Sequence, residues 1–327
     1  MTHLLEIRGL KTHFKTDDGW VHAVDGVDLH VDAGETLCVV GESGSGKSVT
    51  AMSVLKLLPM PPGRIVAGQV LWEGRDLVPL SQAEMRKLRG REIGMVFQEP
   101  MTALNPVYTV GEQIGESLRL HEGLSRAAAL DRAAELLALV HISQATRRVH
   151  DYPHQFSGGM RQRVMLALAL ACKPRLLIAD EPTTALDVTI QAQILDLLGE
   201  LKERLGMAVL LITHAMGVVA EVAQRVVVMY AGQVIEEGSV EQLFERPWHP
   251  YTQGLIRSIP RIDADASRGT RLASIHGTVP SLLAPPPGCR FAPRCAYARD
   301  ACTRATPALR DVAAGHRVAC ILEEAPP

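Results

Sequence analysis

The chain has 327 residues, with 34 Lys and Arg against 36 Asp and Glu, which gives a formal net charge of −2. This balance gives no electrostatic reason to expect nucleic acid or an anionic membrane as the main partner. Hydrophobic residues make up 47% and charged residues 21%, values typical of a folded soluble protein, so disorder is not expected over most of the chain. The longest apolar run, residues 164–172, is far shorter than the roughly 20 residues that a membrane-spanning helix needs.

The start of the chain lacks a basic segment followed by a long apolar one. We therefore expect no signal peptide and take the cytosol as the default compartment. The chain has six cysteines. In a reducing compartment they are expected to be thiols or metal ligands rather than disulfides.

Short apolar runs predict strands in the first third of the chain. They cover residues 4–8, 27–31, 35–40 and 93–97. The run at 35–40 is bounded by Gly34 and Gly41, which is typical of a buried strand. The pattern of residues 46–58 predicts a helix, which should end before the Pro-rich breaker at residues 59–63.

Residues 110–172 have a mainly helical pattern, with Ala- and Leu-rich stretches at 127–140 and 161–171. Two apolar runs of strand length follow, at 176–179 and 208–213. A helix pattern at residues 190–205 lies between them. Strand, helix and strand in this order predict a parallel crossover unit, and hence an α/β fold with helices on both faces of the sheet.

Ala231 and Gly232 separate the apolar runs 226–230 and 233–236, which predicts a hairpin. The composition changes after Pro260, since residues 261–327 contain nine Arg, no Lys and four of the six cysteines. We therefore expect one domain over residues 1–255 and an extension over residues 256–327.

Residues 41–48 (GESGSGKS) fit the phosphate-loop pattern G-x-x-x-x-G-K-[ST] between a predicted strand and a predicted helix. Glycines let the backbone wrap around phosphate, and successive N–H groups and the helix N-terminus face the anion. Lys47 is expected to reach the outer phosphates and the Ser48 hydroxyl to ligate Mg²⁺. The other expected nucleotide-binding residues are Gly41, Ser43, Gly44, Ser45, Gly46 and Val49. The alternative is an ordinary Gly-rich turn.

The apolar run at 176–179 ends in Asp180 and Glu181. Ligands bind at the carboxyl ends of strands in an open parallel sheet, so Asp180 is expected to hold Mg²⁺ through water. Glu181 is placed to orient or deprotonate an attacking water, the alternative being a solvated acidic helix cap. His214 follows the next apolar run and is expected either to contact the terminal phosphate or to be a structural hydrogen-bonding residue.

Residues 156–163 (FSGGMRQR) resemble the signature loop of ATP-binding cassette (ABC) ATPases, Leu-Ser-Gly-Gly-Gln, with Phe in place of Leu and Met in place of Gln. A Gly-rich helix N-terminus is a second anion-binding element. The resemblance implies that this loop closes over the nucleotide of a facing subunit in a head-to-tail dimer. The matching residues are Ser157, Gly158, Gly159 and Met160.

Further motifs match the ABC family in order. The resemblance implies that Gln98 ligates Mg²⁺ and contacts the membrane partner, that Asp187 crosses the dimer interface and that His214 is the switch histidine. Phe14 resembles the adenine-stacking aromatic, with Trp20 as a competitor and edge-strand packing as the alternative.

The implied fold is that of a P-loop NTPase cassette, with a RecA-like mixed sheet core and an N-terminal antiparallel β subdomain. Over residues 1–255 this is the nucleotide-binding domain, with an inserted helical subdomain at about residues 100–172. The Cys-rich extension follows.

Residues 97–106 (FQEPMTALNP), residues 248–260 (WHPYTQGLIRSIP) and the cysteine tail are similar to oligopeptide/dipeptide importer ATPases. Residues 58–65 (LPMPPGRI) resemble the D-type subunit of that group. The resemblance implies an ATPase at the cytoplasmic face of the cell membrane, with an F-type sister ATPase, two permeases and an extracytoplasmic peptide-binding protein. The alternatives are a nickel importer, a cytosolic non-transport ABC ATPase and a redox-sensing regulatory cassette.

Four cysteines of the extension are spaced C-x5-C-x6-C-x17-C, without the C-x2-C pairs of zinc ribbons. They are Cys289, Cys295, Cys302 and Cys320. Four thiolates suit a [4Fe–4S] cluster, and the family resemblance implies one in this tail. Zinc and an unliganded tail remain open, although a short segment with little apolar content buries too little surface to fold alone. Cys38 and Cys172 are expected to be buried small hydrophobes.

Overall fold

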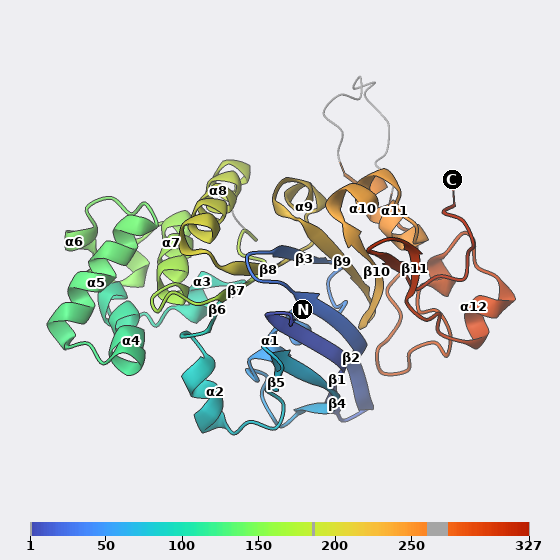
Figure 1. Cartoon of the computed structure of the whole chain (residues 1–327), viewed down its shortest axis with the longest axis horizontal. Coiled ribbons are helices and arrows are strands. Elements are labelled where there is room, and N and C mark those ends of the chain that lie inside the picture. Colours follow the sequence, from blue (N-terminus) through green and yellow to red (C-terminus); the bar gives the residue numbers. More distant parts are fainter. Residues whose placement is uncertain (1, 185–186, 260–273, 327) are drawn as a thin grey trace, which may run out of the picture. The chain divides into compact units, whose positions relative to one another are not determined.

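The structure, a computed structural model, describes residues 2–184, 187–259 and 274–326 (Figure 1). The chain divides into two compact units. The first comprises Met1–His30, Thr36–Val78 and Thr213–Pro327, and the second comprises Val31–Glu35 and Pro79–Ile212. No helix among the described residues is long and apolar enough to cross a membrane.

The first unit contains an antiparallel sheet with the strand order β2-β1-β4-β5. Its strands are β1 (Leu5–Thr16), β2 (Gly19–Val31), β4 (Gly63–Trp72) and β5 (Arg75–Asp76). The sheet corresponds to the predicted antiparallel β subdomain. β1 and β2 are longer than predicted, and β4 was not predicted, because six consecutive residues of β4 are at most half-buried and show no apolar alternation.

A second group of strands in the first unit has the order β11-β12-β10-β9-β3. The strands are β3 (Thr36–Val40), β9 (Arg225–Tyr230), β10 (Gln233–Ser239), β11 (Arg310–Ala313) and β12 (His316–Val318). β3 and β9 are parallel, whereas β9 and β10 form the predicted antiparallel hairpin. β12 pairs with β10, so the C-terminal extension adds two strands to the unit that carries the phosphate loop.

The helices of the first unit are short. They are α1 (Lys47–Val54), α9 (Met216–Val222), α10 (Val240–Glu245), α11 (Pro250–Arg257) and α12 (Asp300–Arg304), with the 3-10 turn η2 (Ala292–Arg294). The helix predicted for residues 46–58 therefore ends earlier, at Val54. The reason is that Lys56 takes a left-handed conformation, with φ of 49°, which cannot continue an α-helix.

The second unit contains three parallel strands in the order β8-β7-β6. They are β6 (Ile93–Val96), β7 (Leu176–Asp180) and β8 (Ala208–Thr213). Almost all of their residues are buried, as continuous apolar runs in a parallel sheet require. The helix α8 (Val188–Leu205) connects β7 to β8, which confirms the predicted crossover.

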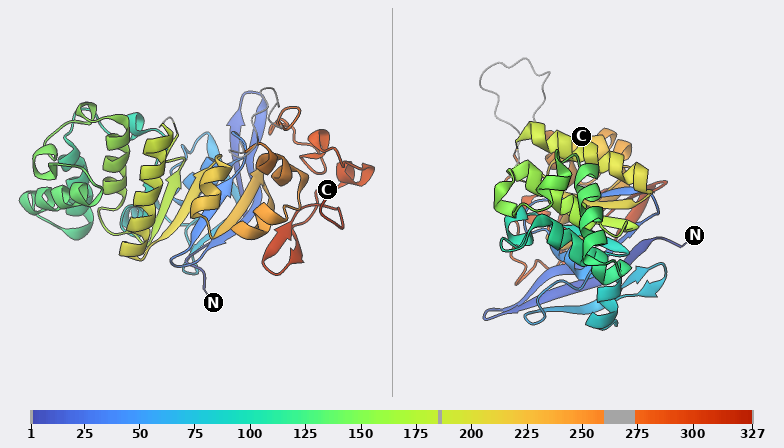
Figure 2. Two further views of the ribbon diagram at one scale, coloured as in Figure 1. Left: turned by 90° about the horizontal axis from the view of Figure 1, so that it is seen from above. Right: turned by 90° about the vertical axis from the view of Figure 1, so that its left-hand side faces the viewer.

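The remaining helices of the second unit lie in the predicted helical region, except α2, which precedes it and was not predicted. They are α2 (Gln82–Leu88), α3 (Pro100–Ala103), α4 (Val110–Glu122), α5 (Arg126–Leu139), α6 (Ala145–Arg148) and α7 (Gly158–Ala169), with the 3-10 turn η1 (Pro153–Gln155). α4, α5 and α7 pack against one another (the green helices of Figure 2). Thr109, Ser125 and Ser157 cap their N-termini, each accepting a backbone N–H bond three residues on.

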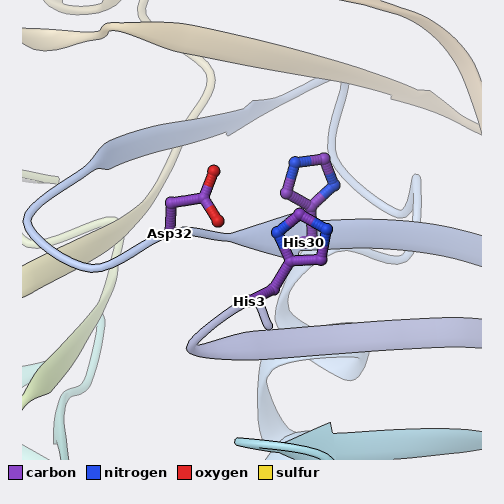
Figure 3. Close-up of side chains that lie close together, drawn as sticks. All are labelled: His3, His30 and Asp32. Carbon is purple, nitrogen blue, oxygen red and sulfur yellow. The ribbon is translucent and has the colours of Figure 1, made fainter. Parts of the chain in front are cut away.

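Two histidines with tilted rings lie in contact near the start of the chain, where His3 precedes β1 and His30 lies near the end of β2. Their ring centroids are 3.9 Å apart (Figure 3). Arg225 Nη1 lies 2.8 Å from His30 Nε2 and acts as its donor, so this nitrogen is an acceptor that is already engaged. The contact between His30 and Arg225 therefore joins β2 to β9.

Replacing Ile178, fully buried in the middle of β7, with Ala should lower the free energy of unfolding by about 2–5 kcal/mol, because the cavity loses packing against both neighbouring strands. Urea titration followed by circular dichroism measures this change. Val188→Ala is the matched control, since Val188 is 84% exposed and should shift stability by no more than about 0.5 kcal/mol. Equal effects of the two substitutions would contradict the assignment of β7 to the core.

Candidate functional site

The phosphate-loop residues lie between β3 and α1. Gly46 forms the N-cap of α1 with φ of 99°. Lys47 is buried and its side chain turns back over the loop, donating from Nζ to the carbonyl oxygens of Gly41 at 2.7 Å and Glu42 at 3.0 Å. Ser43 and Gly44 at the tip are exposed, whereas Ser45 is buried. The loop thus presents its tip to an anion and holds an ammonium group beneath it.

The loop packs backbone to backbone on β9, on β2 and on the turn between β9 and β10. A Cβ atom at Gly41 would lie 2.2 Å from the Met229 carbonyl oxygen, and one at Gly46 would lie 2.5 Å from that of Ala23. The Gly232 amide donates to the Ser45 carbonyl oxygen at 2.9 Å. These approaches leave no room for a side chain, which explains why the pattern needs glycine at both ends of the loop.

The residues after the loop, Ser48 and Val49, lie half-buried in the first turn of α1. Phe14 is half-buried in β1 and lies directly opposite Gly63 of β4 in the strand register. Trp20, its competitor, is 42% exposed. The position of Phe14 is consistent with cross-strand packing, so its contact with adenine stays a prediction.

The acidic residues at the end of β7 are held by specific contacts. Asp180 is buried, and Glu181 has φ of 46°, a left-handed conformation that is rare for a residue other than glycine. Glu181 Oε2 accepts hydrogen bonds from Gln98 Nε2 at 3.1 Å and from Thr184 Oγ1 at 2.9 Å. The structure therefore brings together Gln98 and Glu181, two predicted site residues 83 positions apart.

The signature residues begin α7. Ser157 and Gly158 are exposed, and the Ser157 hydroxyl accepts from the Met160 amide. A Cβ at Gly159 would lie 2.7 Å from Ile190 Cγ2 of α8, so Gly159 permits the two helices to approach closely. Phe156 is buried, which explains how an apolar aromatic replaces the usual Leu before this motif.

Asp187 forms the N-cap of α8, where its Oδ1 accepts from the Ile190 amide at 2.9 Å. Two other residues of the predicted interface loop, 185 and 186, lie outside the described residues.

His214 follows β8 and is exposed. The phosphate loop, Phe14 and His214 belong to the first unit, whereas Gln98, Asp180, Glu181, Asp187 and the signature residues belong to the second.

The four tail cysteines carry free thiols and lie near one another. Burial raises the pKa of Cys289, Cys295 and Cys320, and neighbouring cysteines raise it further. Backbone N–H groups oppose this shift by donating to the same three sulfurs. The Arg299 amide lies 3.4 Å from Cys302 Sγ. Thiols are the ligand type of iron–sulfur clusters, and a cluster at these four residues stays a prediction.

The other two cysteines are packing residues. Burial raises the pKa of Cys38 to about 12 and that of Cys172 to about 11, so both remain protonated thiols at neutral pH. Cys38 is buried, as expected, whereas Cys172 is only half-buried and its thiol donates to the Ser117 carbonyl oxygen at 3.7 Å.

Sequence reasoning missed two residues beside the phosphate loop. Arg294 forms an ion pair with Glu42, the second residue of the loop, and Arg290 forms one with Asp25. The Glu42 carboxylate holds the pKa of the Arg294 guanidinium above its ordinary value. The only signal in the sequence was the Arg-rich, Lys-free composition of residues 261–327. That composition does not indicate which acidic residues would pair with these arginines.

Two family descriptions match this chain. Residues 24–184 match "ABC transporter" and residues 235–302 match "Oligopeptide/dipeptide transporter, C-terminal region". The probable peptide ABC transporter ATP-binding protein y4tR of Sinorhizobium fredii is 54% identical, over 97% of this chain and 94% of that protein. The chain belongs to the ATP-binding proteins of peptide ABC transporters.

Other relatives of this ABC protein agree. The oligopeptide transport ATP-binding protein OppD of Bacillus subtilis is 56% identical, over 91% of this chain and 83% of that protein. A dimeric ATP-binding cassette, MJ0796, solved with ADP and phosphate, superposes with a TM-score of 0.65 at 30% identity and covers 72% of this chain and 98% of that one. These similarities confirm the predicted ABC cassette fold.

Replacing Glu181 with Gln should reduce ATP turnover in the assembled transporter by about 10²-fold or more, because a neutral amide cannot accept a proton from water. The Gln98 and Thr184 hydrogen bonds can still form on the amide oxygen, so nucleotide binding should persist. Steady-state hydrolysis and nucleotide titration separate the two effects. Glu203→Gln makes the same charge change at an exposed position of α8 and serves as the control. Turnover like that of the control would remove Glu181 from the chemistry.

Proposed function

We propose that this chain is the ATP-hydrolysing subunit that powers import of di- and oligopeptides across the cytoplasmic membrane. The observation that carries the proposal is the phosphate loop, whose glycine backbone and buried Lys47 form an anion site in a chain of the peptide ABC transporter family. The relatives named for peptide transport match nearly the whole chain, including the extension.

The residue roles follow from chemistry. Lys47, Ser48 and the loop amides hold the phosphates of ATP, and Ser48, Gln98 and Asp180 hold Mg²⁺, directly or through water. The Gln98 amide nitrogen is engaged by Glu181, which leaves its carbonyl oxygen for the cation. Glu181 activates water, and His214 and Gln98 sense the terminal phosphate.

A second cassette completes the site. The exposed Ser157 and Gly158 at the start of α7 are available to a nucleotide bound by a facing subunit, and Asp187 lies at the start of the neighbouring helix α8. The facing subunit is an F-type sister ATPase. Closing and hydrolysis then bias a two-state pair of cassettes.

The helical region supplies a surface for the permeases. A hollow of about 700 Å³ is lined by residues of α3, α4 and the loop between them, among them Asn105, Tyr108 and Gln113. Val107 and Tyr108 are exposed beside it. A hollow with an exposed apolar rim supports docking of a permease segment, which would hold the chain at the cytoplasmic face of the membrane. An extracytoplasmic peptide-binding protein delivers the substrate.

The tail cysteines hold a [4Fe–4S] cluster. Burial and neighbouring cysteines raise the pKa of three of these thiols, and N–H donors are directed at the same three, which supports a cluster over an unliganded tail. Cys289, Cys295, Cys302 and Cys320 would be its ligands, and it would stabilise a segment with little apolar surface of its own.

Replacing Lys47 with Ala should weaken binding of ATP by about 10- to 100-fold, because charge-assisted hydrogen bonds to phosphate are lost. Titration with a fluorescent ATP analogue measures this change. Lys87→Ala, at an exposed position of α2, removes the same charge elsewhere and should bind ATP like the wild type.

The same Lys47→Ala substitution in the native organism separates peptide from nickel as the cargo. Uptake of a labelled tripeptide should fall to the level of a gene deletion, and uptake of Ni²⁺ should not change. Loss of nickel uptake with normal peptide uptake would establish the nickel importer instead, and no change in either would exclude import.

Protein purified without oxygen should show a broad visible absorption band and contain iron and sulfide in equal amounts. Cys302→Ser should abolish the band, since the cluster loses a ligand. Cys172→Ser, outside the tail, should retain it. A colourless wild-type protein, with zinc or with no metal, would refute the cluster.

A further inference from the structure

Arg294 and Arg290 lie in residues 289–295, between the first two cysteines of the tail, and both side chains are only 5% exposed. Buried arginines are rare unless each is paired, and here the pairing acidic residues lie about 250 positions away in sequence, beside the phosphate loop. These two side chains therefore connect the extension to the phosphate loop and to the residues packed against it.

Arg294 is bound on every side. Its two terminal nitrogens donate to the two carboxylate oxygens of Glu42 at 2.7 and 3.1 Å, a bidentate pair. Further donors go to the Tyr230 hydroxyl at 3.2 Å and to the carbonyl oxygens of Ile275 and His276. The side chain thus joins the loop, the end of β9 and the extension itself.

Arg290 holds the other side of the same turn. It donates to the Ala231 carbonyl oxygen and to the Asp25 carboxylate. Gly232, which follows Ala231 in the chain, donates from its backbone amide to the Ser45 carbonyl oxygen at 2.9 Å. Arg290 therefore fixes the turn on which the phosphate loop rests.

Glu42 has a second anchor, at its backbone. Its backbone amide donates to the hydroxyl of Tyr251, a fully buried residue of α11, at 2.8 Å. Phe291 packs its ring against Tyr230 and Tyr251, with centroids 5.3 and 5.4 Å apart. The residues that surround Glu42 are thus rigid and mostly belong to the C-terminal part of the chain.

The charge of Glu42 gives this arrangement a consequence for binding. A carboxylate within a loop that must hold a polyanion repels the phosphates unless a cation neutralises it. Arg294 is the cation that does so through two hydrogen bonds. Without Arg294, the loop would carry an uncompensated negative charge beside its ligand and would lose its side-chain anchor.

We propose that Arg294 is a positioning residue for the phosphate loop: the C-terminal extension inserts it to neutralise and fix Glu42, and thereby sets the affinity for nucleotide. Arg290 assists by holding the β9–β10 turn beneath the loop. This proposal rests on the assignment of residues 41–48 as the nucleotide site and adds the extension as a part of that site.

The test measures binding of a fluorescent ATP analogue to the full chain and ATP hydrolysis by the assembled transporter. Arg294→Gln should weaken binding about tenfold (~1.4 kcal/mol) and raise KM by a similar factor with a smaller change in kcat. Arg304→Gln, an exposed arginine of α12, is the matched control and should bind like the wild type.

The double variant Arg294→Gln/Glu42→Gln distinguishes charge compensation from general support of the fold. Removing the Glu42 charge should recover most of the lost affinity, giving a coupling that a merely structural arginine would not show. Affinity of Arg294→Gln equal to that of the control, or a double variant as weak as the single one, would overturn the proposal.

Two further measurements keep the outcome clear. If Arg294→Gln lacks a cooperative thermal transition, the Arg294→Lys variant is measured in its place. Binding of the ATP analogue to Arg294→Lys should weaken about threefold, because Lys keeps the charge but cannot form the bidentate pair. No weakening in this variant would overturn the proposal. Lys47→Ala is measured in parallel. If Lys47→Ala binds ATP normally, the nucleotide site itself is wrong; if only Arg294→Gln binds normally, the positioning role alone fails.

Discussion

The close backbone contacts of the phosphate loop with β9, with β2 and with the β9–β10 turn are the constraint on which the rest of the site depends. Gly41 and Gly46 have no space for a Cβ atom, because carbonyl oxygens of Met229 and Ala23 occupy it. The loop is therefore shaped by what lies behind it as much as by its own sequence. Its N–H groups and Lys47 can face an anion only while that turn keeps its place.

Residues of the C-terminal extension hold the β9–β10 turn in place. Arg290 binds the Ala231 carbonyl oxygen, and β12 continues the same set of strands by pairing with β10. A cysteine cluster in this extension would then hold residues 289–295 in the conformation that presents both arginines. The extension and the phosphate loop therefore belong to the same compact unit of the chain.

Local patterns in the sequence predict the phosphate loop, the end of β7 and the crossover through α8, because glycine spacing and continuous apolar runs act over a few residues. They do not predict β4, whose middle residues lack alternation, or the early end of α1 at Val54. The Gln98–Glu181 contact was foreseeable only through family resemblance. The Arg294–Glu42 pair was not foreseeable, since it joins residues 252 positions apart and neither side chain belongs to a motif.

A carboxylate at position 42 looks unfavourable if the loop is considered alone, and its removal would then be expected to help an anion bind. The structure reverses this expectation, because removing Glu42 alone would leave the buried Arg294 without its bidentate partner, and breaking one half of a buried ion pair is costly. The two residues therefore have to be considered together. Position 42 lies in the part matched by the general ABC family and position 294 in the part matched by the peptide-transporter extension, so this ion pair, like that of Arg290 with Asp25, links the shared ATPase machinery to the segment particular to this group.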